Sequence, residues 1–249
     1  MSIQSEVALP KTPYAAPKQS SNTLLASLPL EEYQRIAVHL RSVPMRVKDV
    51  LYKQDAPVEA IYFPGGGACT LVKTTEDGRT AEVGVVGREG MIGGSVFFAL
   101  GVAPCDVVVQ MAGPCDVLPL DAFTMEMERR GAFQRRVANY SALRMTQLMQ
   151  ATACNSLHSA EQRLARWMLA LRDRANGDEL PFTHEFASTM LGLRRPTVTL
   201  IAAKLQATGV IEYRRGSVRI VDRAGLEASA CECYRAIKTT FEGRFAEAG

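Results

Sequence analysis

The sequence predicts an α+β protein in which a β jelly roll comes first, a long helix follows, and two short helices with a β-hairpin come last. Three observations predict this. Short apolar runs separated by turn residues fill positions 45–120, helical periodicity runs from about 121 to 175, and a helix-turn-helix pattern with a hairpin follows. We expect four segments: a disordered tail 1–22, a jelly-roll domain 23–125, a long helix 126–157 and a C-terminal domain 158–249.

Composition narrows the class of protein. The 249 residues are 47% hydrophobic and 22% charged with a mean hydropathy of -0.02, which is typical of a globular chain. The formal net charge of +3 does not by itself indicate nucleic-acid binding. No apolar run reaches the roughly 18 residues that a membrane span needs, and the N-terminus lacks a basic segment followed by an apolar one. We therefore expect a cytoplasmic protein without membrane contact.

The N-terminal 125 residues follow a simple order. Residues 1–22 carry three prolines among small polar residues and predict a mobile tail. A short amphipathic helix is predicted from about Pro29 to Leu40. From Met45 the pattern changes to strand-like runs separated by QDAP, GGG, EDGR, GREG and AGP, each a turn signal. EDGR between two such runs predicts a hairpin, and this many short strands favour a jelly roll, sandwich or barrel.

A long helix is predicted after the strands, because apolar residues from Phe133 onward repeat at intervals of three and four. Such a stripe can pack on the chain's own β domain or pair with a second copy as a coiled coil. We expect both, and hence a homodimer. The residues expected on the dimer helix are Val137, Tyr140, Arg144, Leu148 and Ala151.

The C-terminal segment carries the strongest functional pattern. A capping box of Ser159 and Gln162 begins one helix, which we expect to end at Gly177. Two short helices then follow, the first ended by Gly192 and the second by Gly209, and their spacing predicts a helix-turn-helix. VIEYRRGSVRIVD predicts a β-hairpin with a cationic tip, so the whole is a winged helix-turn-helix.

Local charge indicates what this motif binds. Between Pro181 and Arg223 seven basic residues face three acidic ones, a net +4 that exceeds the +3 of the whole chain. Basic residues are usually only a solvated surface, but clustering at a helix N-terminus and a hairpin tip is what phosphate contact requires. The residues expected to contact DNA are Thr183, Arg194, Arg195, Thr197, Thr199, Lys204, Arg214, Arg215 and Ser217.

The segment FTHEFASTMLGLRRPTVTLIAAKLQATGVIEYRRGSVRIVDRAGLEA resembles the winged helix of the Crp/Fnr family of bacterial transcription regulators. The order of parts is similar too: a cyclic-nucleotide-binding-like jelly roll, a dimerisation helix and the winged helix, over about residues 23–245. The resemblance implies a DNA-binding regulator, not an enzyme. It implies four partners: double-stranded DNA, a second copy of the chain, RNA polymerase and a small-molecule effector.

The resemblance also shows where this chain departs from the family. Arg195 takes the place of the base-reading arginine and Thr197 that of a phosphate-contacting hydroxyl. Pro196 replaces the acidic residue that usually follows this arginine in the family, and Leu200 replaces a second base-reading arginine. The carboxylate that would accept from cytosine and one guanine-reading fork are therefore missing. We expect a different DNA half-site, with Arg194, Thr199 and the wing taking over part of the readout.

The effector region departs from the cyclic-AMP-binding members as well. Gly94 occupies the position of the family's ribose-binding glutamate, and Cys105-Asp106 occupies that of its phosphate-binding Arg-Ser pair. An aspartate repels a phosphate, so we expect an effector other than cyclic AMP. The residues expected near the effector are Arg88, Glu89, Gly94, Ser95, Cys105 and Asp106. Arg88 and Glu89 can equally be parts of a solvated turn, since glycines flank them.

Neither a metal nor another cofactor is expected. The six cysteines are scattered without a CxxC pair, which fits reduced thiols, and Cys231-x-Cys233 has no histidine near it in the sequence. Residues 1–68 hold no cysteine for an iron-sulfur cluster, and the three histidines fall on predicted helices. Two alternatives stay open: a constitutive DNA-binding regulator with a vestigial pocket, or a small-molecule-binding jelly roll. A metal-binding cupin is excluded, since residues 45–120 contain no histidine.

Overall fold

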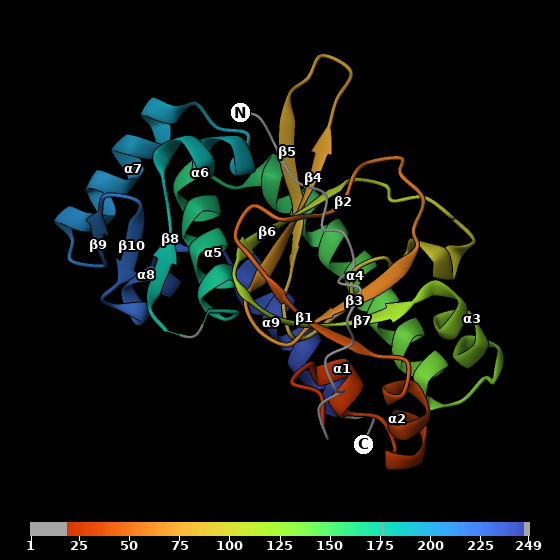
Figure 1. Ribbon diagram of the computed structural model, residues 1–249. Coiled ribbons are helices and arrows are strands. Elements are labelled where there is room, and N and C mark those ends of the chain that lie inside the picture. Colours follow the sequence, from red (N-terminus) through yellow and green to blue (C-terminus); the bar gives the residue numbers. More distant parts are fainter. Residues whose placement is uncertain (1–18, 176, 247–249) are drawn as a thin grey trace. The chain divides into compact units, whose positions relative to one another are not determined.

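The computed structural model describes residues 19–175 and 177–246, with side chains up to residue 240 (Figure 1). The chain forms two compact units. The N-terminal unit contains Met1–Thr74 and Gly84–Ala142, and the C-terminal unit contains Thr75–Val83 and Leu143–Gly249. The architecture is the predicted α+β one, but the second unit includes a short piece of the strand region that sequence reasoning had assigned wholly to the first domain.

Two antiparallel sheets contain the strands of residues 41–119, which belong to the N-terminal unit except for Thr75–Val83. One has the strand order β1-β7-β3 and the other β2-β6-β4-β5. Their strands are β1 Arg41–Met45, β2 Val50–Tyr52, β3 Ala60–Pro64, β4 Ala68–Thr74, β5 Thr80–Val86, β6 Asp106–Met111 and β7 Gly113–Pro119. The predicted EDGR hairpin is present: it joins β4 to β5, with Gly78 in the left-handed region at φ 79°.

Helices cover this roll at its ends. They are α1 Thr23–Ala26, α2 Leu30–Ala37, the 3₁₀ helix η1 Gly94–Phe98, α3 Leu120–Glu128 and the first part of α4 Ala132–Leu157. The predicted helix 29–40 is thus shorter than expected. The predicted helix 126–157 is divided in two, because Arg130 adopts a positive φ of 55° and Gly131 separates α3 from α4.

The beginning of α4 is capped from a distant part of the chain. The carboxylate of Glu32 on α2 accepts hydrogen bonds from the backbone nitrogens of Ala132 and Phe133, each at 2.9 Å. Partial burial would raise the pKa of Glu32, but these two N–H groups lower it overall. A Cβ on Gly131 would lie 2.8 Å from a Glu32 carboxylate oxygen, so glycine leaves room for this cap.

Apolar side chains between the sheets and α4 form the core of the N-terminal unit. Phe63 of β3 and Phe133 of α4 are fully buried with ring centroids 6.5 Å apart. The ring of Phe123 on α3 meets Phe133 edge-on at 5.6 Å. Gly90 lies so close to the ring of Tyr140 on α4 that no Cβ fits between them.

The predicted tail 1–22 differs from the structure in its last residues. Ser20 and Asn22 are buried. The hydroxyl of Ser20 donates to Asp116 at 2.6 Å. The Asn22 side chain caps α1 and donates to the backbone carbonyls of Pro64 and Gly90, at 2.8 Å each. These hydrogen bonds hold residues 20–22 in the fold. Residues 1–18 lie outside the described part of the chain.

The C-terminal unit consists of helices around one small sheet. The helices are the rest of α4, α5 Ala160–Arg172, α6 His184–Leu191, α7 Arg195–Ala207, α8 Arg223–Ser229 and α9 Cys233–Ala246. The sheet has the order β8-β10-β9, with β8 Glu179–Pro181, β9 Ile211–Arg214 and β10 Ser217–Ile220. The capping box of Ser159 and Gln162 is confirmed, although α5 ends five residues before Gly177.

Within the C-terminal unit, the segment Thr75–Val83 contacts Trp167 of α5. The buried indole donates its N–H to a carboxylate oxygen of Glu82 at 3.0 Å. Burial raises the pKa of Glu82 to about 7, although the Trp167 hydrogen bond and the positive charges of Arg166 and Arg174 act in the opposite direction. Glu82 is therefore a carboxyl group that titrates near neutral pH.

Candidate nucleic-acid interface

The predicted helix-turn-helix is confirmed as α6 and α7. The Thr183 hydroxyl caps α6 by accepting from the backbone nitrogen of Phe186 at 3.1 Å. Gly192 ends α6 in the left-handed conformation at φ 61°, which turns the chain within three residues into α7. The inward face of α7 is formed by four buried residues, Val198, Ile201, Ala202 and Leu205.

The opposite face of α7 is exposed and cationic at its N-terminus. Arg194 and Arg195 are exposed, Thr197 is half-buried, and Thr199 is exposed one turn later. Pro196 lies in the first turn, where its missing N–H interrupts no helical hydrogen bond. The free N–H groups and the positive end of the helix dipole add to the charge of the two arginines. This end of α7 is suited to contact phosphate and base edges.

The side chain of Arg195 is weakly held in the free protein. Its guanidinium lies 3.7 Å from Glu185 of α6, and both side chains are about two-thirds exposed, at 67% and 69%. An ion pair this exposed contributes little, about 0–1 kcal/mol. Among the described residues Arg194 has no carboxylate partner. Both arginines can therefore exchange their present surroundings for a polyanion at small cost.

His184 is a residue of this surface that sequence reasoning missed. The hydroxyl of Thr199 donates to the carbonyl of Arg195 and lies 3.0 Å from Nδ1 of His184. The imidazole stacks on the ring of Tyr213 with centroids 4.8 Å apart. Partial burial, then the nearby charge of Arg195, lower the pKa of His184. The imidazole therefore connects α7, through Thr199, to Tyr213 of β9 in the wing. This role cannot be predicted from the sequence, because Tyr213 approaches His184 only in the folded chain.

The wing is the β9-β10 hairpin, closed by Arg215 and Gly216. Gly216 has a φ of 89°, which favours glycine at this position. Arg215 is exposed and has no ion-pair partner among the described residues, whereas Arg214 pairs with Glu212 at 3.0 Å on an exposed surface. The Ser217 hydroxyl donates to Glu179 at 2.8 Å, so it fixes the hairpin to β8. The cationic tip was predicted, and the structural role of Ser217 was not.

Lys204 differs from its expected place on this surface. Its ammonium group lies 2.7 Å from a carboxylate oxygen of Glu161 on α5. Lys204 belongs to the last turn of α7, away from the cationic N-terminus. In the free protein it ties α7 to α5 instead of extending the cationic end of the helix.

The exposed apolar residues of α4 are only in part the expected ones, since Leu148 is the one predicted residue among them. Val137 and Tyr140, predicted to take part in dimer pairing, are buried in the N-terminal unit, where Tyr140 donates to the carbonyl of Met91 at 3.2 Å. This is a correction, since those side chains are covered within one protomer. The exposed apolar residues of α4 are Met145, Leu148, Met149 and Leu157. Arg144 donates to Gln147 of the same helix at 2.5 Å, and Ala151 is half-buried.

Three of the six predicted effector residues use their side chains to hold the protein's own backbone. A carboxylate oxygen of Asp106 accepts from the backbone nitrogen of Gln54 at 2.8 Å, and the Ser95 hydroxyl donates to the carbonyl of Val102 at 3.1 Å. Glu89 accepts from the nitrogen of Gly87 at 3.2 Å. Cys105 is buried, Arg88 is exposed, and Gly94 begins η1. These contacts explain how the loop is held, and the effector role of the six residues stays a prediction.

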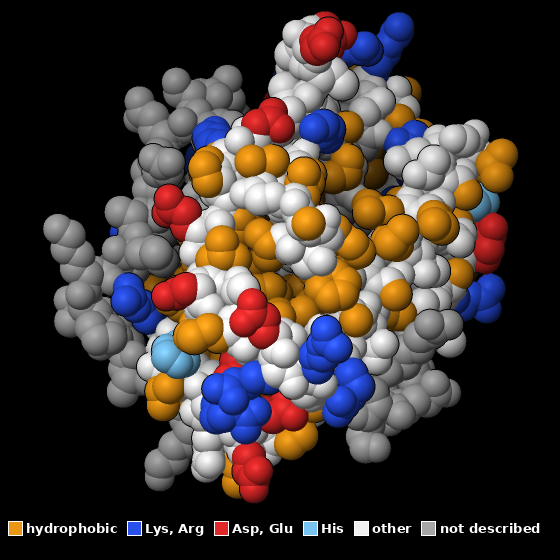
Figure 2. Space-filling model, turned by 90° about the vertical axis from the view of Figure 1, so that its right-hand side faces the viewer, with side chains coloured by type: hydrophobic (Ala, Val, Ile, Leu, Met, Phe, Trp, Pro, Cys, Tyr) orange, Lys and Arg blue, Asp and Glu red, His pale blue; other side chains and the backbone are white. Residues whose placement is uncertain are grey.

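Exposed apolar side chains are numerous on one face of the molecule. Figure 2 shows them over its centre, with Lys, Arg, Asp and Glu mainly around them. The exposed large apolar residues of the N-terminal unit include Phe98 and Leu100, at and just after the end of η1, and Met125 on α3.

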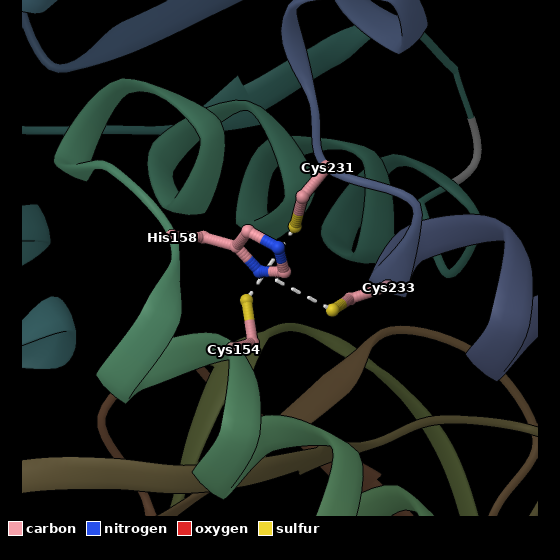
Figure 3. Close-up of side chains that lie close together, drawn as sticks. All are labelled: Cys154, His158, Cys231 and Cys233. Carbon is pink, nitrogen blue, oxygen red and sulfur yellow. Dashed lines mark hydrogen bonds between the residues drawn. The ribbon is translucent and has the colours of Figure 1, made fainter.

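A group of possible metal ligands is present in the C-terminal unit. It consists of Cys154, His158, Cys231 and Cys233, hereafter the Cys₃His cluster (Figure 3). Along the chain no histidine lies close to Cys231 and Cys233, so the sequence pattern predicted no metal site here. Folding brings the end of α4 to the junction of α8 and α9 and so supplies His158 and a third cysteine.

Comparison with known proteins agrees with this description. Residues 43–130 match the model of the cyclic nucleotide-binding domain, and residues 162–229 match that of the Crp-like helix-turn-helix domain. Among proteins with curated annotation none matches the sequence. None of the helices in the described part of the chain combines the length and apolar character needed to cross a bilayer.

Solved structures of similar fold come from several bacteria. A transcriptional regulator of the Crp/Fnr family from Eubacterium rectale is 17% identical with a TM-score of 0.66, over 85% of this chain and 97% of that one. FixK2 from Bradyrhizobium japonicum is 15% identical with a TM-score of 0.66, over 77% and 98%. The c-di-GMP-responsive global regulator CLP from Xanthomonas campestris is 13% identical with a TM-score of 0.63, over 77% and 99%.

The two family models follow one another in the order of the two folds described above, and the exposed cationic end of α7 lies within the second of them. The chain belongs to the Crp/Fnr family of DNA-binding transcription regulators.

Proposed function

We propose that this protein acts as a homodimer that reads operator DNA with the N-terminus of α7 and the wing, under the control of an effector other than cyclic AMP. The observation that carries the proposal is the cluster of exposed cations and hydroxyls on the first turns of α7. The buried opposite face fixes α7 to the unit, so the exposed face can enter a major groove as one rigid surface.

Three side chains of α7 take different roles in this proposal. Arg195 reads guanine with its planar fork, because a guanidinium matches the two acceptors O6 and N7. Leu200 is 72% exposed on the same helix and contacts a thymine methyl group, the apolar feature of the major groove. Thr197 donates to a phosphate, which positions the helix without reading sequence.

The wing adds a contact that does not depend on sequence. Arg215 at its tip is exposed and free of ion pairs among the described residues, so it can neutralise a phosphate of the flanking backbone. Binding of a phosphate by a cation releases counterions and makes affinity depend on salt. Loss of Arg215 therefore weakens binding to all sequences alike.

A selection from random DNA duplexes provides the operator, and gel shifts with variants then test the roles. For R195A we expect a loss of about 5- to 150-fold on the selected site, equivalent to about 1–3 kcal/mol, and relaxed preference at one base pair. For R215A we expect a uniform loss and a salt slope smaller by about 1. R41A, on the exposed end of β1 in the other unit, is the matched control. Unchanged site preference in R195A refutes the reading role.

The exposed apolar residues Met145, Leu148 and Met149 support the dimer. Their spacing of three and four residues places them on neighbouring positions of one face of α4. Dimers of this kind of regulator present two recognition helices to half-sites about one DNA turn apart. We expect M149E to shift the protein toward monomer in analytical ultracentrifugation and to weaken operator binding, while M125E, on exposed α3, does neither. A dimeric M149E of unchanged affinity refutes this interface.

The effector proposal is supported by Asp106, which stands where cyclic-AMP-binding members have a phosphate-binding pair. Its carboxylate holds the backbone of Gln54 and would repel a phosphate placed beside it. Effectors differ among proteins of this fold, since CLP responds to c-di-GMP. Native mass spectrometry of the purified protein identifies a retained ligand, and calorimetry with cyclic AMP tests the exclusion. Micromolar binding of cyclic AMP that D106N does not improve contradicts it.

A further inference from the structure

The donor atoms of the Cys₃His cluster all lie within 4.8 Å of one another. The sulfurs of Cys154 and Cys231 are 3.5 Å apart, and the sulfur of Cys233 lies 3.5 Å from Nδ1 of His158. The three cysteines are buried and the imidazole is partly exposed. Figure 3 shows the four side chains pointing toward a common centre from the end of α4 and from the chain between α8 and α9.

We propose that the Cys₃His cluster binds one Zn²⁺ ion. Zinc prefers four ligands in a tetrahedron, with bonds of about 2.3 Å to sulfur and about 2.0–2.1 Å to imidazole nitrogen. Such bonds place two ligand atoms roughly 3.5–3.8 Å apart along each edge of the tetrahedron. Two of the edges are already at 3.5 Å, and no two donor atoms lie more than 4.8 Å apart, so small side-chain rotations close the remaining edges.

The surroundings of the cluster are those of a metal site. Nε2 of His158 lies 3.2 Å from a carboxylate oxygen of Glu232, so it can donate to that group while Nδ1 faces the sulfurs. A carboxylate behind a metal-binding histidine fixes its tautomer and orientation. The side-chain amide of Gln150 donates to the sulfur of Cys233 at 3.0 Å, which stabilises a thiolate. Each supporting residue thus contacts one of the four ligands directly, Glu232 the histidine and Gln150 a cysteine.

The geometry favours a single zinc ion over other occupants. A cluster of several irons would need its cysteines spread around a body several bond lengths across, whereas these donors surround one point. A disulfide between Cys154 and Cys231 would use two of the sulfurs and leave Cys233, His158 and Glu232 without a role. One ion uses all four donors, and both supporting residues as well.

The site joins two parts of the C-terminal unit that are far apart in sequence. Cys154 and His158 are one helical turn apart at the end of α4, and Cys231 and Cys233 lead into α9. Metal binding to preorganised ligands adds its free energy to folding. The proposed ion therefore fastens α4, the helix with the exposed apolar stripe, to the helices α8 and α9 that complete the DNA-binding unit.

The experiment begins with metal analysis of the full-length protein, purified without chelators or a metal-affinity tag. We expect about one zinc ion per chain, because four ligands complete one coordination sphere. The double variant C231S/C233S should lose the metal, and C115S, which alters a buried thiol of the N-terminal unit, should keep it. Since the double variant can fail to fold, a second variant leaves all ligands in place. For E232Q we expect zinc affinity about 10- to 100-fold weaker in a competition with a chromogenic chelator, and for E128Q, on exposed α3, no change.

Cobalt supplies a spectroscopic test that does not depend on variants. We expect the chelator-treated wild-type protein to take up Co²⁺ with a sulfur-to-cobalt charge-transfer band and the intense visible bands of a tetrahedral ion. Substoichiometric zinc together with an octahedral cobalt spectrum overturns the proposal. Equal zinc affinity in E232Q and the wild type does so as well. The third contrary result is a Cys154–Cys231 disulfide, detected by mass spectrometry in protein that retains no metal after purification under reducing conditions.

Discussion

Glu82 makes the stability of the C-terminal unit depend on pH near neutrality. Its pKa is raised from 4.5 to about 7 by burial, and its carboxylate accepts from the indole of Trp167. A carboxyl whose folded pKa is raised favours folding when protonated, so its contribution is complete below the unfolded pKa and is lost as pH rises through the folded pKa. The free energy of unfolding should therefore fall between about pH 4.5 and pH 7 on account of this group.

The magnitude follows from the difference between the two pKa values. At about 1.4 kcal/mol per pH unit, a raise from 4.5 to about 7 corresponds to about 3 kcal/mol as an upper limit. E82Q removes the charge and keeps an oxygen that can accept from Trp167. We expect E82Q to be up to about 3 kcal/mol more stable than the wild type at pH 8, and to match it near pH 4.5.

Trp167 provides the assay, because it is the single tryptophan of the chain. Its fluorescence during urea unfolding reports on the unit that contains Glu82, at a fixed protein concentration so that dimerisation does not change the midpoint. The native emission should also titrate with a midpoint near pH 7 in the wild type and not in E82Q. E76Q, on the exposed tip of the same hairpin, is the control. If E82Q and wild type lose stability in parallel from pH 5 to pH 8, the reasoning is refuted.

Two further predictions concern the positions where a helix is fixed. G90A places a methyl group against the ring of Tyr140, so we expect the free energy of unfolding in urea to fall by about 1–3 kcal/mol. Adding Y140A removes the ring and should restore part of this loss. Additive losses in the double variant would argue against the contact. T183A removes the cap of α6 and should lower the free energy of unfolding by about 1 kcal/mol. T183S retains the hydroxyl and should lower it much less. Equal losses in both variants would show that the methyl group of Thr183, and not the cap, stabilises α6.

Local patterns predicted the elements of this fold well. Turn residues separate the strands as expected, and the glycine after α6 and the proline in α7 mark the helix-turn-helix, because both act on the backbone of their own neighbourhood. The exposure of Arg194 and Arg195 could also be predicted, since an exposed helix N-terminus is visible in the pattern of apolar residues.

Contacts between distant segments could not be predicted in this way. Periodicity shows that one face of α4 is apolar, but it does not say that the N-terminal unit covers Val137 and Tyr140. Nothing near Ala132 indicates that its N–H group is capped by Glu32, a residue on another helix. The Cys₃His cluster was missed because more than seventy residues separate His158 from Cys231.

The assignment of Thr75–Val83 to the C-terminal unit has a consequence for dissecting the protein. That unit is discontinuous in sequence, so no single cut along the chain releases it whole. A fragment of residues 158–249 would carry Trp167 without its acceptor Glu82, and Cys231 without Cys154. A buried indole N–H that loses its partner is costly, by about 1–3 kcal/mol. Swapping DNA-binding halves between relatives at the end of α4 would likewise separate a donor from its acceptor, and a functional chimaera has to exchange the β4-β5 tip together with the helices.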